Sequence, residues 1–464
     1  MKAVILAAGK GERLSAAINV PKPLTPLLGL TVIERAILSL KECGITDFVI
    51  VVGYRSEEVK RYVESRFHTH ADVNIKFVQN EEFDEGNGLS VWKAREAVDN
   101  EDFILMMCDH VFEPGIVKQL LSYAPGTGKC ILCVDRPENV FDLADATKVL
   151  VVGERGQEHP KSIGKGLKEY NAIDCGIFYC TPAIFNALSA AIASGDTALT
   201  GAVQRLIQSD ELGVLDIHGR FWCDIDTPDS LKHAEKKMLS SLGKPADGII
   251  SRHINRKVST RIFTPLILKL YKGVTPTQVS LLSFAVAALS AILFFLSHPI
   301  AGGIFIQLSS ILDGCDGEIA RLKKMSSNLG NFIDAILDRY ADGLILLGMF
   351  YYSATTMGGK EMLSISWSPF MIIVISVLAI LGNLMVSYTS AKSVANFNYQ
   401  YKGRWIATGR GRDSRLFILF TAALLSYFSA IFVLFALIII ALLTNIIVIW
   451  RTVLSWKMFK KDEE

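Results

Sequence analysis

The feature that most constrains this 464-residue chain is a change in hydropathy at Thr275. Before it, polar and apolar residues are mixed as in a soluble protein, whereas long apolar runs appear only after it. About 20 consecutive apolar residues are needed for a helix to cross a bilayer. The sequence therefore predicts a soluble domain joined to a domain of membrane-spanning helices.

Four aspartates occupy one short stretch of the otherwise apolar region. Asp313 and Asp316 are three residues apart, and Asp334 and Asp338 are four residues apart. Both spacings place a pair of side chains on one face of a helix. Ionisable groups at membrane depth are costly, so such a cluster indicates a functional site. Two of these faces turned toward each other would form an acidic site.

Close carboxylates repel one another, and a bound cation removes that cost. Mg²⁺ or Mn²⁺ prefers oxygen ligands, and two such ions about 4 Å apart can hold a phosphoryl group during its transfer. Gly317 and Ala320 leave room for a nucleotide, and Arg321 supplies positive charge for phosphate. The structural alternative is that the aspartates only pair with Arg321 or Lys323 at a helix end.

The spacing of this stretch resembles the signature of the CDP-alcohol phosphotransferases. It reads Asp-x-x-Asp-Gly-x-x-Ala-Arg, then eight residues, Gly330, and finally Asp334 and Asp338 at intervals of four. These integral membrane enzymes move a phosphoalcohol from a CDP donor to an acceptor hydroxyl. The resemblance implies that the four aspartates bind two metal ions and that Asp338 is also the base for the acceptor hydroxyl. It assigns nucleotide contacts to three positions: Gly317, Ala320 and Arg321.

Residues 1–242 alternate β-rich runs with helical patterns. This alternation predicts an α/β domain with a mostly parallel sheet and helices on both faces. Ligands of such sheets bind at the carboxyl ends of the strands. The first strand leads into a loop with Gly9, Lys10, Gly11 and Arg13, where backbone amides and positive charge suit a triphosphate. The predicted nucleotide loop is Leu6, Ala7, Ala8, Gly9, Lys10 and Gly11.

This loop and the following Pro21-Lys22-Pro23 together resemble the nucleotidyltransferases that make NDP-sugars and CDP-alcohols. The resemblance makes Lys22 and Arg13 catalytic through charge neutralisation. It places a metal on Asp109, after an apolar strand, and on Asp226 or Asp224, with Asp226 favoured. All eight histidines are interpreted as structural or solvent-exposed, because no metal-type pair is present.

Substrate contacts in this half are less specifically indicated. Gln79, Asn80 and Gly86 are candidates for contacts with the nucleotide. Lys165 and Lys168 are candidates for the phosphate of the second substrate, although solvated loop lysines would look the same. The eight cysteines do not form a disulfide framework and are expected to be reduced. The net charge of +2 indicates no partner class, and no nucleic acid is expected.

Residues 243–274 are predicted to be a linker and an amphipathic helix on the membrane surface, because basic and apolar residues are interleaved there. Residues 275–464 are predicted to form an all-α domain of six transmembrane helices, with membrane lipids as partners. Positive charges after the second and fourth runs place both termini and both active sites in the cytoplasm. Arginines after the fourth run could also bind an acceptor phosphate. Small residues in the apolar runs would allow a homodimer. The six runs are 279–296, 300–312, 333–353, 369–390, 416–428 and 431–450.

Over nearly the whole chain, the order of domains resembles a family of bifunctional enzymes. These join a CTP:inositol-1-phosphate cytidylyltransferase to a di-myo-inositol phosphate phosphate synthase. The resemblance implies that CTP and inositol 1-phosphate give CDP-inositol and pyrophosphate. Phosphoinositol then passes to a second inositol 1-phosphate and CMP is released, with Mg²⁺ or Mn²⁺ in both domains.

Three other functions fit parts of the pattern. A phospholipid synthase would use the same membrane chemistry with a lipid acceptor or donor. The N-terminal domain could bind a nucleotide without catalysis, although Arg13, Lys22, Asp109 and Asp226 argue for catalysis. A transporter is the least expected, since the carboxylates are predicted near the cytoplasmic end only.

Overall fold

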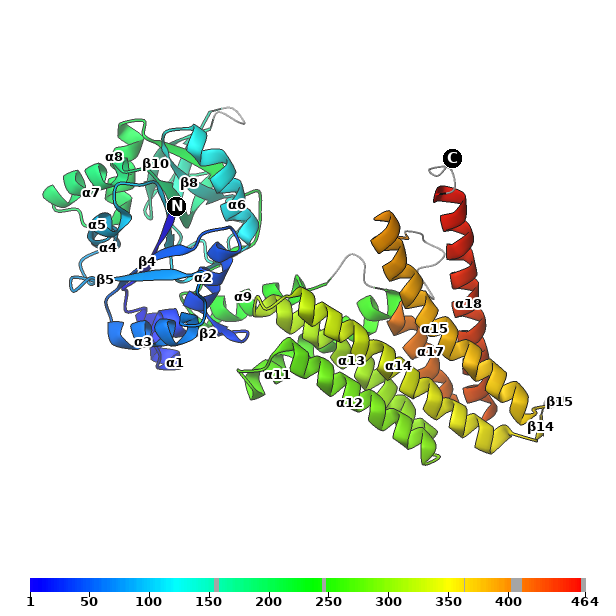
Figure 1. Cartoon of the computed structure of the whole chain (residues 1–464). Coiled ribbons are helices and arrows are strands. Elements are labelled where there is room, and N and C mark those ends of the chain that lie inside the picture. Colours follow the sequence, from blue (N-terminus) through cyan, green and yellow to red (C-terminus); the bar gives the residue numbers. More distant parts are fainter. Residues whose placement is uncertain (154–157, 244–247, 363, 402–410, 460–464) are drawn as a thin grey trace. The chain divides into compact units, whose positions relative to one another are not determined.

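A computed structural model of the chain describes residues 1–153, 158–243, 248–362, 364–401 and 411–459. The chain divides into two compact units, Met1–Met238 and Leu239–Glu464 (Figure 1). Each unit has its own apolar core, and each is described separately below.

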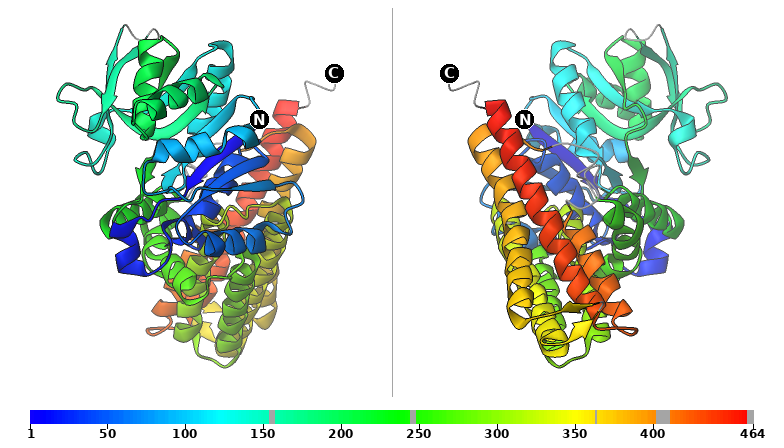
Figure 2. Two further views of the ribbon diagram at one scale, coloured as in Figure 1. Left: turned by 90° about the vertical axis from the view of Figure 1, so that its left-hand side faces the viewer. Right: turned by 90° about the vertical axis from the view of Figure 1, so that its right-hand side faces the viewer.

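The first unit is built on a nine-stranded sheet with helices on both faces (Figures 1 and 2). Successive residues of its first strand point to opposite faces, as the pleat requires. Ile5 packs in one apolar cluster and Val4 in the other. The strands are β1 (Lys2–Ala7), β4 (Asp47–Val52), β5 (Asn74–Gln79), β6 (Phe103–Met107), β8 (Cys130–Asp135), β9 (Lys148–Val152), β10 (His159–Gly164), β11 (Ala172–Cys180) and β12 (Leu212–Asp216).

The helices of this unit follow in chain order. They are α1 (Glu12–Ile18), α2 (Val32–Lys41), α3 (Ser56–Phe67), α4 (Asn87–Lys93), α5 (Arg95–Val98), α6 (Pro114–Tyr123), α7 (Ala183–Ala193), α8 (Leu199–Gln208) and α9 (Pro228–Ser240). Short 3₁₀ turns cover Lys22–Leu24, Ala124–Gly126 and Pro137–Asn139. Two small ribbons pair β2 (Pro26–Leu27) with β3 (Leu30–Thr31) and β7 (His110–Phe112) with β13 (Trp222–Asp224).

The sheet is mixed, which corrects the prediction of a mostly parallel one. β1 pairs in parallel with β4 and β6, and β4 with β5, as predicted for strands joined through helices. β11, however, runs antiparallel to β6, β8 and β9. A parallel connection needs a long crossover, usually a helix. Among the described residues, β8 to β11 are joined without an α-helix, so these strands reverse direction instead.

The second unit is helical. Its long helices are α12 (Pro276–Phe295), α13 (Pro299–Leu322), α14 (Asn328–Met357), α15 (Pro369–Phe397), α17 (Arg412–Leu425) and α18 (Ile431–Phe459). Side-chain caps begin three of them, at Thr275, Ser327 and Ser368. A side chain at Gly348 would meet the backbone of Ala291, so α12 and α14 approach closely there. α15 and α18 lie side by side (Figure 2).

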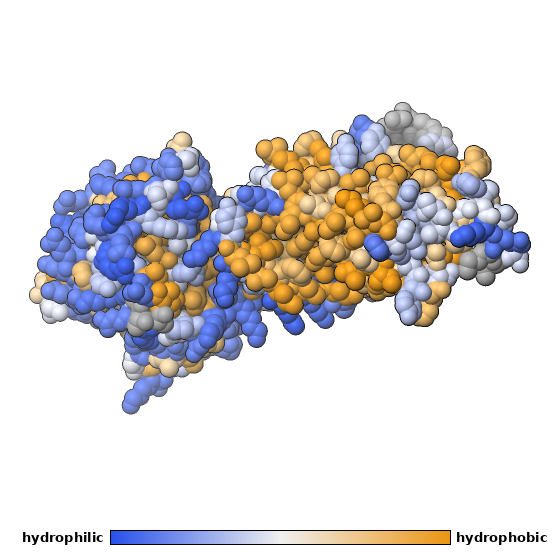
Figure 3. Space-filling model, turned by 90° about the horizontal axis from the view of Figure 1, so that it is seen from below, coloured by the Kyte–Doolittle hydropathy of each residue, from blue (hydrophilic) through white to orange (hydrophobic). Residues whose placement is uncertain are grey.

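Each of the six predicted apolar runs overlaps one of these helices, although 279–296 and 416–428 extend past the ends of α12 and α17. Three of the helices are long and apolar enough to cross a membrane: Pro276–Phe295, Pro369–Phe397 and Ile431–Met458. α17 has 14 residues, and α13 and α14 carry the aspartates. Figure 3 shows apolar side chains gathered over one face of the helical unit. Leu281, Ile373 and Ile446 are among the exposed apolar side chains of its helices.

Residues 251–270, which we call the surface segment, form a continuous helical stretch before α12. It comprises two π-helical turns (Ser251–Asn255 and Ser259–Phe263), α10 (Arg256–Val258) and α11 (Thr264–Leu270). Asn255, Ser259 and Thr264 are buried, whereas Ile262 and Leu266 are exposed. The segment is therefore amphipathic. A two-stranded turn, β14 (Glu361–Met362) with β15 (Ile365–Ser366), precedes α15.

Candidate active sites

The predicted nucleotide loop follows β1. The side chains of Leu6, Ala7 and Ala8 are buried, so only their backbone can face a ligand. Gly11 has a left-handed backbone with φ +58°, and a side chain there would clash with Lys22. The absence of a side chain at Gly11 thus leaves room for the Lys22 side chain to pack against the loop. Lys10 pairs with Asp84 at 2.9 Å.

Lys22 is the centre of a charged cluster at the carboxyl ends of the strands. Its ammonium group pairs with Asp109 and Asp226, and it lies 3.9 Å from Oδ1 of Asp224. Burial opposes charge on Lys22, but the three carboxylates raise its pKa. Burial likewise opposes ionisation of Asp109, but Lys22 and His110 hold the pKa of that carboxyl well below its usual range. The structure thus brings together the lysine and the three carboxylates predicted from sequence.

His110 is buried in the same cluster, beside the predicted metal ligand Asp109. Its ring stacks on Trp222 with centroids 5.8 Å apart, and Nδ1–H donates to Asp109 Oδ1 at 2.8 Å. Burial lowers its pKa, but the Asp109 hydrogen bond together with the charges of Asp224 and Asp109 outweighs this effect and raises the pKa to about 9. The sequence does contain a signal for His110, because this residue immediately follows Asp109, the predicted metal ligand.

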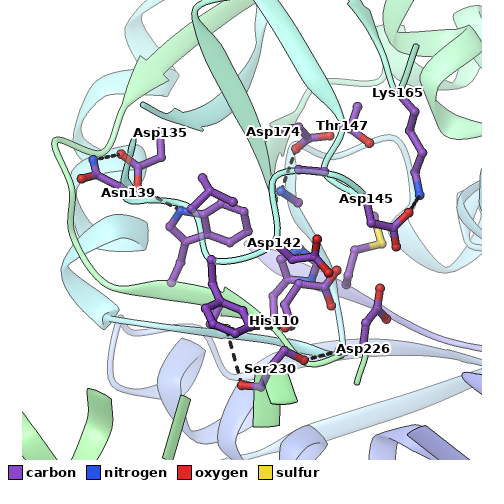
Figure 4. Close-up of a pocket in the computed structure, with 18 of the residues that line it drawn as sticks. His110, Asp135, Asn139, Asp142, Asp145, Thr147, Lys165, Asp174, Asp226 and Ser230 are labelled. Atoms are coloured by element: carbon purple, nitrogen blue, oxygen red, sulfur yellow. Dashed lines mark hydrogen bonds and ion pairs between the residues drawn. The ribbon is translucent and has the colours of Figure 1, made fainter. Parts of the chain in front are cut away.

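A cavity of about 510 Å³ opens beside this cluster (Figure 4). Arg13 bridges Asp145 at 2.6 Å and Asp226 at 2.7 Å, and Lys165 pairs with Asp145 at 2.9 Å. Arg13, Asp145 and Lys165 thus form one chain of alternating charge at its edge. Lys168 is exposed in the turn that follows β10 and lies outside the set of cavity-lining residues.

The predicted base contacts differ in accessibility. Gln79 is exposed at the end of β5. Asn80 is fully buried, donates to the Ser90 hydroxyl at 2.9 Å and accepts from the Glu82 N–H at 3.1 Å. Gly86 has φ +150°, and a side chain there would meet the Thr197 carbonyl. Gln79 is therefore the more accessible of the two polar candidates.

The four aspartates of the helical unit converge as predicted from their spacing. Carboxylate oxygens of Asp313, Asp334 and Asp338 lie within 4.8 Å of one another. Asp316 accepts from the Ser280 hydroxyl and shares a cavity of about 200 Å³ with Asp313 and Asp334. Gly317 and Ala320 line the same cavity. Arg321 lies beside Gly317 and donates to the Leu242 carbonyl at 3.1 Å.

The comparisons with known proteins cover both units. Residues 3–208 match the MobA-like NTP transferase domain, and residues 273–457 match the CDP-alcohol phosphatidyltransferase family. A protein of Archaeoglobus fulgidus named "Bifunctional IPC transferase and DIPP synthase" is 34% identical over 98% of this chain and 85% of its own length. A protein of the same name from Aquifex aeolicus is 33% identical over 98% of both chains. This chain belongs to that family.

The chain is an enzyme with a nucleotidyltransferase domain and a CDP-alcohol phosphotransferase domain, which confirms the family predicted from sequence. The second domain and its three long apolar helices make it a membrane protein. A further relative, from Rubrobacter xylanophilus and of the same name, is 36% identical over 91% of this chain and 90% of its own length. The solved inositol-1-phosphate CTP transferase of T. maritima is 27% identical, covers 49% of this chain and 90% of its own, and superposes with a TM-score of 0.44.

Enzymes of these two domain types generally use divalent metals, and the donor atoms present fit such ions. Asp109, His110 and Asp224 offer ligand atoms within 4.8 Å of one another. Oδ1 of Asp224 is buried without a hydrogen-bond donor among the described residues. Burial and the nearby Asp109 raise the pKa of Asp224 to about 7. A cation would provide a partner for this oxygen, which accepts no hydrogen bond from the residues described, and would reduce the repulsion between Asp109 and Asp224. The membrane cluster offers only oxygen ligands, which suit hard divalent ions.

Sequence reasoning missed Asp342 and Asn383 at the membrane site and did not single out Arg412. Arg412, in the first turn of α17, lies 2.7 Å from Asp313, 2.8 Å from Asp338 and 2.7 Å from Asp342. Asn383 donates to Asp342 at 3.1 Å. Asp342 follows Asp338 by four residues and so continues the same helical face, which the sequence could have shown. Arg412 was identified only as one of several arginines between the fourth and fifth runs.

We predict that His110→Asn raises the Mg²⁺ concentration needed for nucleotidyl transfer. His110 contacts Asp109, and loss of such a group beside a metal ligand typically costs about 10–100-fold in affinity or activity. The assay is CDP-alcohol formation at increasing Mg²⁺ concentration. The control is His68→Gln at an exposed position. An unchanged Mg²⁺ dependence in His110→Asn would show that His110 does not contribute to metal binding.

Proposed function

We propose that the soluble domain converts CTP and inositol 1-phosphate to CDP-inositol and pyrophosphate. The membrane domain then transfers phosphoinositol from CDP-inositol to a second inositol 1-phosphate and releases CMP. The observation that carries this proposal is the match, over 98% of the chain, to relatives whose name contains both activities. The two separate acidic clusters support it, because each step needs its own phosphoryl-transfer site.

In the first step, a phosphate oxygen of inositol 1-phosphate attacks the α-phosphorus of CTP, and the bond to pyrophosphate breaks. The phosphomonoester is already ionised at neutral pH, so positioning and charge neutralisation are sufficient. Arg13 and Lys22 lie where the triphosphate loop meets the carboxylates, and Lys165 lies at the cavity edge for the second phosphate. Mg²⁺ held by Asp109 and by Asp224 or Asp226 would neutralise phosphate charge when bound.

In the second step, the acceptor hydroxyl attacks the phosphorus that carries the inositol, and the bond to CMP breaks. Asp338 takes the hydroxyl proton. Arg412 contacts both Asp338 and Asp342, so it holds the base in place. Arg412 and the neighbouring Arg415, both largely buried at the start of α17, also suit the phosphate of the acceptor. Mg²⁺ or Mn²⁺ on Asp313, Asp316, Asp334 and Asp338 would stabilise the charge on the transferred phosphoryl group.

The domain limits follow the same proposal: residues 1–242 for the soluble enzyme, 243–274 for the linker and surface segment, and 275–464 for the membrane enzyme. All six long helices cross the bilayer, with both termini and both active sites in the cytoplasm. The support is the alternation of positive charge between successive connections.

Asp174 is the side chain we assign to recognition of the inositol ring. It lines the cavity, and Oδ1 accepts the Gly176 N–H at 2.7 Å (Figure 4). Burial raises its pKa to about 6. A carboxylate held in this way accepts hydrogen bonds from vicinal hydroxyls. We predict that Asp174→Asn raises the KM for inositol 1-phosphate roughly tenfold, by weakening a charge-assisted hydrogen bond, and leaves the KM for CTP unchanged. An equal effect on both substrates would contradict this role.

The test of the proposal is the identity of the product. Purified protein in detergent would receive CTP, Mg²⁺ and labelled inositol 1-phosphate, followed by mass spectrometry of the aqueous and organic phases. The proposal expects CDP-inositol and an aqueous inositol phosphodiester. Absence of CDP-inositol would overturn the first step. Label in the organic phase after addition of lipids would instead identify a lipid acceptor.

A further inference from the structure

Glu318 occupies an undefined position of the membrane-domain signature, two residues after Asp316. Its carboxylate is fully buried. It accepts three hydrogen bonds of 2.6 Å each, from Arg256 Nη1, the Ser259 hydroxyl and the Thr264 hydroxyl. All three donors belong to the surface segment, and Glu318 belongs to α13. Hydrogen bonds to one buried carboxylate therefore hold the surface segment against α13, the helix that carries Asp313 and Asp316.

The same face of α13 makes further polar contacts with the surface segment. Gln307 donates to Asn255 at 2.7 Å, and Asn255 donates to Ser310 at 2.9 Å. Positions 307, 310, 314 and 318 are spaced by three and four residues and so form one face of the helix. Polar pairs along a whole face fix both the rotation and the axial position of α13.

Arg256 contacts both Glu318 and the turn of α13 that carries Asp313 and Asp316. Its Nη1 also donates to the Gly314 carbonyl at 3.0 Å, between Asp313 and Asp316 in the sequence. A side chain at Gly314 would lie 3.2 Å from the same nitrogen, so a larger residue would push the guanidinium away. Arg256 also lines the cavity that contains Asp313, Asp316 and Asp334. It therefore contacts both Glu318 and the backbone that carries two of the carboxylates.

We propose that Arg256 and Glu318 are positioning residues of the transferase site. Together they hold the Asp313–Gly317 turn of α13 so that its carboxylates face Asp334 across the cavity. The surface segment is thus part of the active site and not only a membrane anchor. This inference rests on the proposed transferase reaction. A buried ion pair adds little net stability compared with apolar side chains of similar size, which is consistent with a role in geometry.

The experiment uses the full chain in detergent and supplies CDP-inositol directly. The variants are Arg256→Met, Arg256→Lys, Glu318→Gln and the double variant Arg256→Met with Glu318→Met. The control is Lys257→Met, an exposed basic residue on the same segment. Three quantities are measured: the rate of transfer against Mg²⁺ concentration, the affinity for Mn²⁺ by electron paramagnetic resonance, and the rate of CDP-inositol synthesis.

Arg256→Met and Glu318→Gln are expected to lower the kcat of transfer about tenfold or more and to weaken Mn²⁺ binding at the membrane site, as loss of a group that orients metal ligands does. Arg256→Lys should recover part of the loss. Lys257→Met should match the wild type, and CDP-inositol synthesis should be unchanged in every variant.

If a single substitution prevents folding, the double variant provides the test, because it removes both charges and leaves no buried charge unpaired. Wild-type transfer and Mn²⁺ affinity in the double variant would overturn the proposal. Loss of thermal stability alone, with normal transfer and Mn²⁺ binding in the single variants, would do the same. Failure of the wild-type chain to use CDP-inositol would overturn the proposed function instead.

Discussion

Asp334→Asn is expected to reduce phosphoinositol transfer roughly 10³-fold, because it removes a charge that holds metal ions at the reacting phosphate. Asp334 lies with Asp313 and Asp338 in one group of carboxylates. An amide of the same size keeps the packing but loses the charge. Transfer is measured as CMP release from supplied CDP-inositol and inositol 1-phosphate.

The same chain contains its own control for this change. CDP-inositol synthesis should continue at the wild-type rate in Asp334→Asn, because the soluble site uses other residues. Glu361→Gln, an exposed carboxylate in the same unit, is the matched variant and should transfer normally. Transfer above about a tenth of the wild-type rate in Asp334→Asn would exclude the carboxylate cluster as the metal site.

Asp109→Asn is expected to produce the opposite pattern, with CDP-inositol synthesis reduced roughly 10³-fold. Asp109 pairs with Lys22 and His110, and its low pKa keeps it charged at neutral pH. The variant loses that charge and leaves Lys22 with one fewer partner. Pyrophosphate release from CTP and inositol 1-phosphate measures the first step.

Supplied CDP-inositol should restore product formation in Asp109→Asn, because the membrane site is intact. Asp99→Asn is a suitable control, since Asp99 is exposed and has a left-handed backbone that asparagine also tolerates. Normal pyrophosphate release by Asp109→Asn would show that Asp109 does not act in the first step.

Local patterns predicted much of both sites, because their residues follow strands or repeat at helical spacing. Asp109 follows an apolar strand, and the aspartate pairs of the membrane domain lie on single helical faces. Their convergence followed from these positions once the helices packed. The Gly11 loop and Lys22 were also close in sequence, so their contact needed no long-range information.

The residues that were missed depend on packing between distant segments. Arg412 reaches Asp313 and Asp342 only because α17 packs against α13 and brings this side chain to the carboxylates of α14. Its sequence context is equally typical of a membrane-orientation signal. β11 runs antiparallel to β6, a strand that is distant in the sequence, so local patterns could not show the direction of this pairing. Asn80 follows a strand as a ligand-binding residue would, yet its amide bonds Ser90 in the interior.

The most direct test of two consecutive activities in one chain is a ³¹P NMR time course. The purified chain in detergent would receive only CTP, Mg²⁺ and inositol 1-phosphate. The expected result is a transient CDP-inositol signal, followed by equal amounts of pyrophosphate, CMP and an inositol phosphodiester. Pyrophosphate release with stable CDP-inositol and no CMP, or no reaction of CTP, would contradict the account.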